Sequence, residues 1–257
     1  MEVIICNTEV EIGATAAAKV AKVTKAVQAT GRNVVIGVAT GSSPLSTYAA
    51  LKQLIDLGEL DLSQASAFAL DEYVGLPTSH PESYREVIRR TVTQPLGLAP
   101  ERVHVPDGAA TDLEKAGADY DAAIKAAGGV DVQILGVGSN GHIGFNEPIS
   151  SLSSRTRMVP LTEQTRRDNA RFFSSIAEVP TRCLTQGLGT IMEARHCVLV
   201  ATGVGKAAAV KALVEGPVQA MCPASVLQLH ESATIIIDEA AAAQLELKDY
   251  YLAQSAS

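Results

Sequence analysis

Long apolar runs are missing from this chain of 257 residues, and none is long enough to cross a membrane. The first residues, MEVIICNTEVEI, have no basic segment and no small-residue cleavage site, so they do not match a secretory signal peptide. Cysteine is also scarce. The four cysteines (Cys6, Cys183, Cys197 and Cys222) show no spacing typical of metal ligands or disulfide pairs. These absences predict a cytoplasmic protein with reduced thiols and no membrane partner.

An excess of positive charge is absent as well. Lysine and arginine together number 21 against 28 acidic residues, which gives a net charge of −7. This balance argues against nucleic acid as a partner, and an anionic ligand would need a local group of cations. The five histidines make no ligand spacing with one another, so no metal site is expected.

Apolar residues make up 47% of the chain, enough for a substantial core. Short buried-strand patterns alternate with helical patterns from end to end. Strands are predicted at 2–6, 33–40, 65–73, 130–138, 196–203 and 233–238. Helices are predicted at 11–30, 48–57, 112–127, 162–173 and 206–214, the third starting with a capping box of Thr111 and Glu114. The alternation predicts an α/β fold, a mostly parallel open sheet with helices on both faces, in one domain over residues 1–257.

Ligands of such sheets bind beyond the carboxyl ends of the strands, so the residues at these ends are informative. The segment TGSSP (40–44) offers a glycine, two hydroxyls and backbone N–H groups, which suits either an anion site or an ordinary turn with a serine cap. GVGSNG (136–141) has the glycine spacing of the dinucleotide-binding pattern GxGxxG. That pattern requires a helix to follow directly, whereas HIGFNEP follows here, so a dinucleotide site is not expected. GVGK (203–206) lacks the spacing of a nucleotide-binding loop, but Lys206 could still bind a single phosphate or lie in solvent.

Two further strand ends carry groups suited to acid–base chemistry. Asp71 follows a buried strand and could serve as a general base, or Asp71 and Glu72 could be a helix cap or a surface pair. His142 lies in a glycine-rich turn and could move protons, or it could be an ordinary loop histidine. Five arginines crowd into residues 155–171, as either an anion-binding patch or the charged outer face of a helix.

Three segments, LDEYVGL, GHIGFNEP and SLSSRTR, together resemble the glucosamine-6-phosphate deaminases (glucosamine-6-phosphate isomerases). The resemblance runs from TGSSP through VATGVGK to LQLH and so covers nearly the whole chain. It implies a modified Rossmann-like fold shared with 6-phosphogluconolactonases. It also implies a reaction in which glucosamine 6-phosphate and water give fructose 6-phosphate and ammonia, without metal or organic cofactor.

The resemblance also implies roles for individual residues. His142 would assist opening of the sugar ring, with Asn140 and Glu147 orienting it, and Asp71 would move the proton from carbon 2 to carbon 1. The substrate phosphate would be bound by Gly41, Ser42, Ser43, Arg171 and Lys206.

In two places the chain departs from well-known members of the family. Some members have aspartate where this chain has Asn140, and an amide cannot balance the charge of an imidazolium, so Glu147 would have to supply that balance. Ser150 and Arg157 match part of an effector site for N-acetylglucosamine 6-phosphate. Val159 and Pro160 stand where allosteric members have polar residues, so we expect little activation.

Other functions stay open at this point. A 6-phosphogluconolactonase would share the fold, but lactonases typically follow the Gly–His pair with Leu–Phe–Pro, whereas this chain has IGFNEP. A non-catalytic sugar-phosphate-sensing domain would be expected to carry a DNA-binding segment ahead of the sheet. The sequence does not decide between a monomer and a homo-oligomer.

Overall fold

A seven-stranded sheet forms the centre of the computed structural model, which describes residues 1–255. Its strand order is β1-β10-β9-β6-β2-β3-β5, and every neighbouring pair is parallel. The strands are β1 (Glu2–Cys6), β2 (Val35–Val38), β3 (Ser66–Ala69), β5 (Val103–His104), β6 (Val132–Gly136), β9 (Cys197–Ala201) and β10 (Ala233–Asp238). The predicted α/β fold with a mostly parallel sheet is therefore confirmed.

Helices cover both faces of this sheet because successive strand side chains point to opposite sides. Ile134 packs with one group of helices, and its neighbour Leu135 packs with the other. The first group contains α1 (Glu9–Gln28), α2 (Leu45–Asp56) and α3 (Tyr84–Ile88). The second group contains α4 (Leu113–Ala126), α6 (Leu188–Met192), α7 (Ala207–Val214) and α8 (Lys248–Ser255). None of the helices in the described part of the chain is long and apolar enough to span a membrane.

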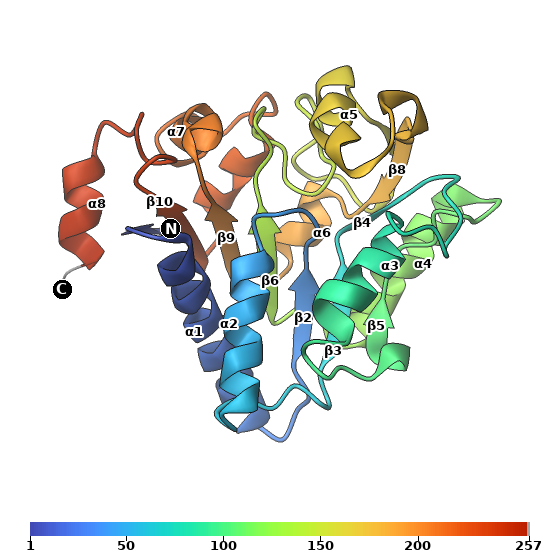
Figure 1. Cartoon of the computed structure of the whole chain (residues 1–257), viewed down its shortest axis with the longest axis horizontal. Coiled ribbons are helices and arrows are strands. Elements are labelled where there is room, and N and C mark those ends of the chain that lie inside the picture. Colours follow the sequence, from blue (N-terminus) through green and yellow to red (C-terminus); the bar gives the residue numbers. More distant parts are fainter. Residues whose placement is uncertain (256–257) are drawn as a thin grey trace.

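A second, three-stranded antiparallel sheet lies at the carboxyl end of the parallel one. It consists of β4 (Asp71–Tyr73), β8 (Arg182–Thr185) and β7 (Arg157–Pro160), in the order β4-β8-β7. Helix α5 (Glu163–Asn169) follows β7, and in Figure 1 α5 and β8 lie above the arrowheads of the parallel strands. This sheet was not predicted, and it covers the edge where ligands of α/β sheets bind.

Three predicted elements differ from the structure. The predicted strand 65–73 is divided at Leu70, because Asp71–Tyr73 pairs with β8 and not with the parallel sheet. The predicted helix 162–173 is α5 followed by a 3-10 turn, Ala170–Phe172. Helix α4 is capped by Asp112, whose side chain accepts from the Lys115 backbone N–H at 2.9 Å, and not by the predicted box starting at Thr111.

At the amino end of the parallel strands, a fully buried carboxylate binds two arginines. Asp131 precedes β6, accepts from the Val35 backbone N–H at 2.9 Å, and pairs with Arg32 at 3.1 Å and Arg195 at 3.0 Å. Asp131 therefore joins the starts of β2 and β6 to Arg195, which lies two residues before β9.

We predict that Asp131→Asn lowers the free energy of unfolding by about 2–4 kcal/mol, because it leaves two guanidinium groups facing a neutral amide. The range is reduced for solvent screening, since both arginine side chains are about half exposed. Urea unfolding would measure it, with Asp119→Asn as the control, because Asp119 pairs with Lys115 on an exposed helix face. Equal stability of the two variants would contradict the prediction.

Candidate active site

A cavity of about 330 Å³ lies at the carboxyl ends of β2, β3 and β6. The chain continues from β2 toward β3 on one side, whereas β6 lies on the other side of β2, so the connecting loops diverge at this point. The predicted site residues that line the cavity are Gly41, Ser42, Ser43, Asp71, His142, Arg171 and Lys206. Segments far apart in the sequence therefore meet where the fold leaves a crevice.

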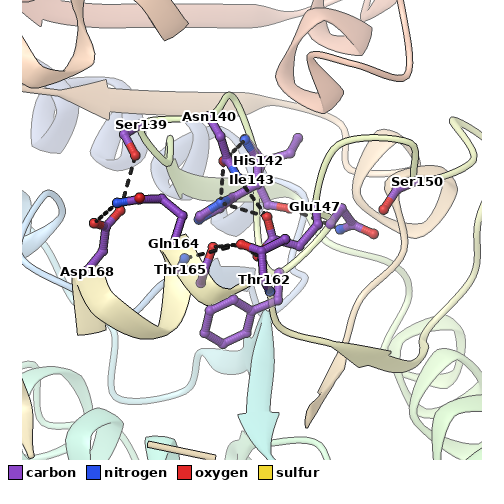
Figure 2. Close-up of polar contacts among 12 residues, drawn as sticks. Ser139, Asn140, His142, Ile143, Glu147, Ser150, Thr162, Gln164, Thr165 and Asp168 are labelled. Carbon is purple, nitrogen blue, oxygen red and sulfur yellow. Dashed lines mark hydrogen bonds and ion pairs between the residues drawn. The ribbon is translucent and has the colours of Figure 1, made fainter. Parts of the chain in front are cut away.

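His142, Asn140 and Glu147 form a hydrogen-bonded chain, which Figure 2 shows. The Asn140 Oδ1 atom lies 2.7 Å from His142 Nδ1, and the Asn140 amide donates to Glu147 Oε2 at 2.7 Å. Because Oδ1 is an acceptor, Nδ1 carries a proton in this arrangement, and Nε2 remains for exchange with a ligand. Gly138 is needed beneath the ring, since a Cβ atom there would lie 2.2 Å from the imidazole.

Glu147 is a buried carboxylate that stays ionised. Burial by itself would raise its pKa, but His142 and the surrounding hydrogen-bond donors lower the pKa to about 2. The side chain of Glu147 also accepts from the hydroxyl of Thr162 at 3.1 Å. Thr162 is the N-cap of α5, so the same contact holds α5 against the glycine-rich turn (Figure 2).

Asp71, at the start of β4, lies on another wall of the cavity and is 5% exposed. Burial, together with the neighbouring charge of Glu72, raises the pKa of Asp71 to about 8. A carboxyl group with a pKa in this range can both accept and return a proton near neutral pH. Gly144 lies close by with a positive φ of 53°, and a Cβ atom there would come within 3.0 Å of the Thr185 hydroxyl.

One end of the cavity combines hydroxyls and cations. Helix α2 has Pro44 as its N-cap with no side-chain hydrogen bond, so Ser42 and Ser43 do not serve as its cap. The Ser42 hydroxyl instead accepts from Arg171 at 3.3 Å. Burial lowers the pKa of Lys206, which precedes α7 and lines the same cavity. This end is suited to a phosphate group.

The other arginines of the cluster make contacts away from this cavity. Arg155 binds Asp121 and Glu193, Arg166 binds backbone carbonyls, and Arg167 pairs with Glu163. Of the five, only Arg171 lines the cavity. Anion binding by Arg171 therefore stays a prediction, while Arg155, Arg166 and Arg167 are engaged by other partners.

Ser150 and Arg157 contact each other at 3.2 Å, outside the lining of the cavity. The same guanidinium also donates to Asn146 at 2.9 Å, and burial lowers its pKa. Within residues 1–255, no group of three or more histidine, cysteine or acidic side chains is arranged to hold a metal ion.

Several residues of the cavity were not predicted from the sequence. They are Tyr84, Thr165, Asp168, Asn169 and Thr202. Tyr84 lies in the segment ESYREV, in which no local pattern distinguishes a cavity residue from any other aromatic on a helix. Asp168 accepts from Ser139 at 3.1 Å and so makes a second link between α5 and the glycine-rich turn (Figure 2).

Comparison with known proteins gives consistent relatives. The glucosamine-6-phosphate deaminase of Pseudarthrobacter chlorophenolicus is 63% identical over 217 residues, which are 84% of this chain and 83% of the relative. The protein of the same name from Arthrobacter sp. is 57% identical over 251 residues, 98% of this chain and 95% of the relative.

Among solved structures, a monomeric glucosamine-6-phosphate deaminase matches with a TM-score of 0.90 and 40% identity, over 95% of this chain and 99% of that one. A 6-phosphogluconolactonase from Trypanosoma brucei matches with a TM-score of 0.75 at 21% identity, over 95% of this chain and 98% of that one, and so shares the fold. The family model described as glucosamine-6-phosphate isomerases/6-phosphogluconolactonase matches residues 7–236. The chain belongs to this family.

Proposed function

We propose that this protein is an enzyme, a glucosamine-6-phosphate deaminase that converts glucosamine 6-phosphate and water into fructose 6-phosphate and ammonia as a single-domain unit. The observation that carries the proposal is the pairing, in one cavity, of a buried carboxyl group of raised pKa, Asp71, with a hydrogen-bonded imidazole, His142. The cations and hydroxyls at the other end suit the phosphate of the substrate. Relatives of this name at 57–63% identity support the same reaction.

In the proposed ring opening, His142 moves a proton from the carbon-1 hydroxyl to the ring oxygen. The bond between carbon 1 and the ring oxygen breaks, and carbon 1 becomes an aldehyde. Asn140 holds Nδ1 at 2.7 Å, so a single ring nitrogen, Nε2, exchanges the proton with the sugar. The ionised Glu147 balances the positive charge on the imidazole while it carries the extra proton, a balance that the Asn140 amide cannot provide.

In the proposed isomerisation, Asp71 takes the proton from carbon 2 and returns it to carbon 1. As carbon 2 loses its proton to Asp71, a proton passes from the ammonium group to the carbonyl oxygen on carbon 1, which gives an enolamine. Return of the proton from Asp71 to carbon 1 gives a protonated imine at carbon 2, so carbon 1 is reduced as carbon 2 is oxidised and no outside oxidant is needed. Water then adds to the imine, and ammonia leaves as the ketone forms. Asp71 must be ionised to start, although its pKa is about 8 in the empty cavity. The ammonium group on carbon 2 of the substrate lies next to the proton removed and lowers that pKa.

A 6-phosphogluconolactonase is the alternative enzyme. Ester hydrolysis by attack of water on a lactone needs no base able to take a proton from carbon, and the solved 6-phosphogluconolactonases match at only 16–21% identity. A sugar-phosphate-sensing domain would need the phosphate end of the cavity but no proton-transferring groups. The pairing of Asp71 with His142 therefore favours the deaminase.

We predict that the purified protein releases ammonia and fructose 6-phosphate from glucosamine 6-phosphate in equal amounts. Coupled assays for the two products would measure this, with 6-phosphogluconolactone offered in parallel. Hydrolysis of the lactone without ammonia release would identify a lactonase instead. Binding of glucosamine 6-phosphate without turnover would identify a sensing domain.

We predict that Asp71→Asn abolishes exchange of the carbon-2 proton with solvent while the sugar phosphate still binds, because an amide cannot accept the proton. Proton NMR in deuterated water would follow the exchange, and isothermal calorimetry would follow binding. Exchange at the wild-type rate would remove Asp71 from the role of base.

The same variant should be more stable than the wild type, by a margin that depends on pH. Below pH 3.8 Asp71 is protonated in both the folded and the unfolded chain, so burial of its charge costs nothing. Between pH 3.8 and about 8 the folded state alone keeps the proton, so wild-type stability falls by up to about 1.4 kcal/mol per pH unit. The thermal midpoints of the two proteins should therefore separate as the pH rises toward 8.

We predict that Lys206→Ala and Arg171→Ala each raise the Michaelis constant for glucosamine 6-phosphate about 10- to 100-fold, because each removes a charge-assisted contact to phosphate. Arg167→Ala is the matched control. The Arg167 side chain is 61% exposed and pairs with Glu163 on α5, away from the cavity. The effect should be absent with unphosphorylated glucosamine. Equal turnover of the two sugars by the wild type would show that the cavity has no phosphate site.

A further inference from the structure

Glu72 is a buried carboxylate that the proposed reaction does not use. It follows Asp71 in β4 and is 4% exposed. Its oxygens accept three backbone N–H groups, from Tyr73 at 2.8 Å, Tyr84 at 2.9 Å and Arg85 at 2.9 Å. Burial raises the pKa of Glu72, but three donors stabilise the ionised form, which accepts without donating.

The hydrogen bonds of Glu72 join two elements that face the cavity. Its own strand, β4, begins with Asp71, and the N–H groups of Tyr84 and Arg85 belong to the first turn of α3. Adjacent residues of a strand point to opposite sides, so Asp71 faces the cavity while Glu72 faces α3. A shift of α3 against β4 would break two of the three hydrogen bonds at once.

Tyr84 is the residue of α3 that this link holds in place. Its ring lines the cavity, stacks on Phe145 with centroids 5.8 Å apart, and lies 4.7 Å from the ring of Tyr73. Phe145 belongs to the turn that carries His142, and their rings are 6.3 Å apart. Tyr84 thus packs against both the strand that holds Asp71 and the turn that holds His142.

The groups that face Asp71 come from several elements. Tyr73, Tyr84, Tyr120 and Cys183 interact with it electrostatically, and burial raises the pKa of each, so all four are neutral near pH 7. Arg85 faces Glu72, and His142 lies on the same cavity. Glu72 is accordingly the negative charge that acts on Asp71.

We propose that Glu72 is a positioning residue for the reaction, which fixes α3 and Tyr84 to the strand of the base and places a carboxylate directly behind Asp71. The proposal rests on the proposed deaminase function, in which Asp71 moves a proton between carbon atoms. The tether sets the geometry of the cavity, and the charge makes Asp71 a stronger base.

Titration of the Asp71 carboxyl by carbon-13 NMR, with its signal assigned through Asp71→Asn, tests the charge without any reaction. Glu72→Gln should lower the titration midpoint by roughly 0.5–1.5 pH units, since a like charge is removed. Glu72→Asp keeps the charge and should leave the midpoint near that of the wild type. Glu86→Gln is the control, because Glu86 lies on α3 but pairs with Arg89. A midpoint unchanged in Glu72→Gln would overturn the charge role.

Steady-state kinetics test the tether. Glu72→Asp is one methylene shorter and cannot keep all three hydrogen bonds, so kcat/KM should fall about 10- to 100-fold while the acid limb of its pH profile stays in place. Tyr84→Ala should reproduce this fall, and it tests the tether by itself if Glu72→Asp does not fold. Wild-type kinetics in both variants would overturn the tether.

A wild type that releases no ammonia, together with a lowered Asp71 midpoint in Glu72→Gln, would overturn the deaminase function and leave the charge role supported.

Discussion

Leu70 joins the two sheets, and the geometry of the site depends on this junction. The backbone N–H of Leu70 donates to Val38 of the parallel sheet at 3.1 Å, and its carbonyl accepts from Gln186, next to β8, at 2.7 Å. The chain therefore leaves the parallel sheet one residue before Asp71 and enters the antiparallel one. This change of partner turns Asp71 into the cavity and Glu72 toward α3, because neighbouring strand residues face opposite ways.

Burying two adjacent carboxylates is costly, and the structure treats them differently. Glu72 accepts three backbone N–H groups, which offset part of its loss of water, although its pKa is still raised. Asp71 has fewer such partners, and its pKa rises to about 8. Glu147, surrounded by donors and close to His142, has a pKa of about 2. Carboxyl groups whose environments push their pKa values apart in this way are typical of sites that perform acid–base chemistry.

Helix α5 depends on the glycine-rich turn in a similar manner. Thr162 at its start binds Glu147, and Asp168 near its end binds Ser139, so both ends of a short helix are fixed to the turn that holds His142. Arg171 follows in the next turn of chain and enters the cavity. The imidazole and the guanidinium, which serve different parts of a sugar phosphate in the proposed reaction, are thus held by one hydrogen-bonded assembly.

The sequence by itself determined the parallel sheet, since short runs of branched apolar residues between helical patterns can be buried only with helices on both faces. It also indicated which strand ends carry chemistry, and the resemblance suggested roles for Asp71, His142 and Lys206. Only the tertiary structure decided that Asp71–Tyr73 pairs with β8, that Arg171 alone of its cluster enters the cavity, that Tyr84 lines it, and that Glu72 accepts from the first turn of α3. These features depend on contacts between residues more than ten positions apart in the chain, such as Asp71 with Thr185 and Glu72 with Tyr84. The local pattern of apolar residues does not predict such contacts.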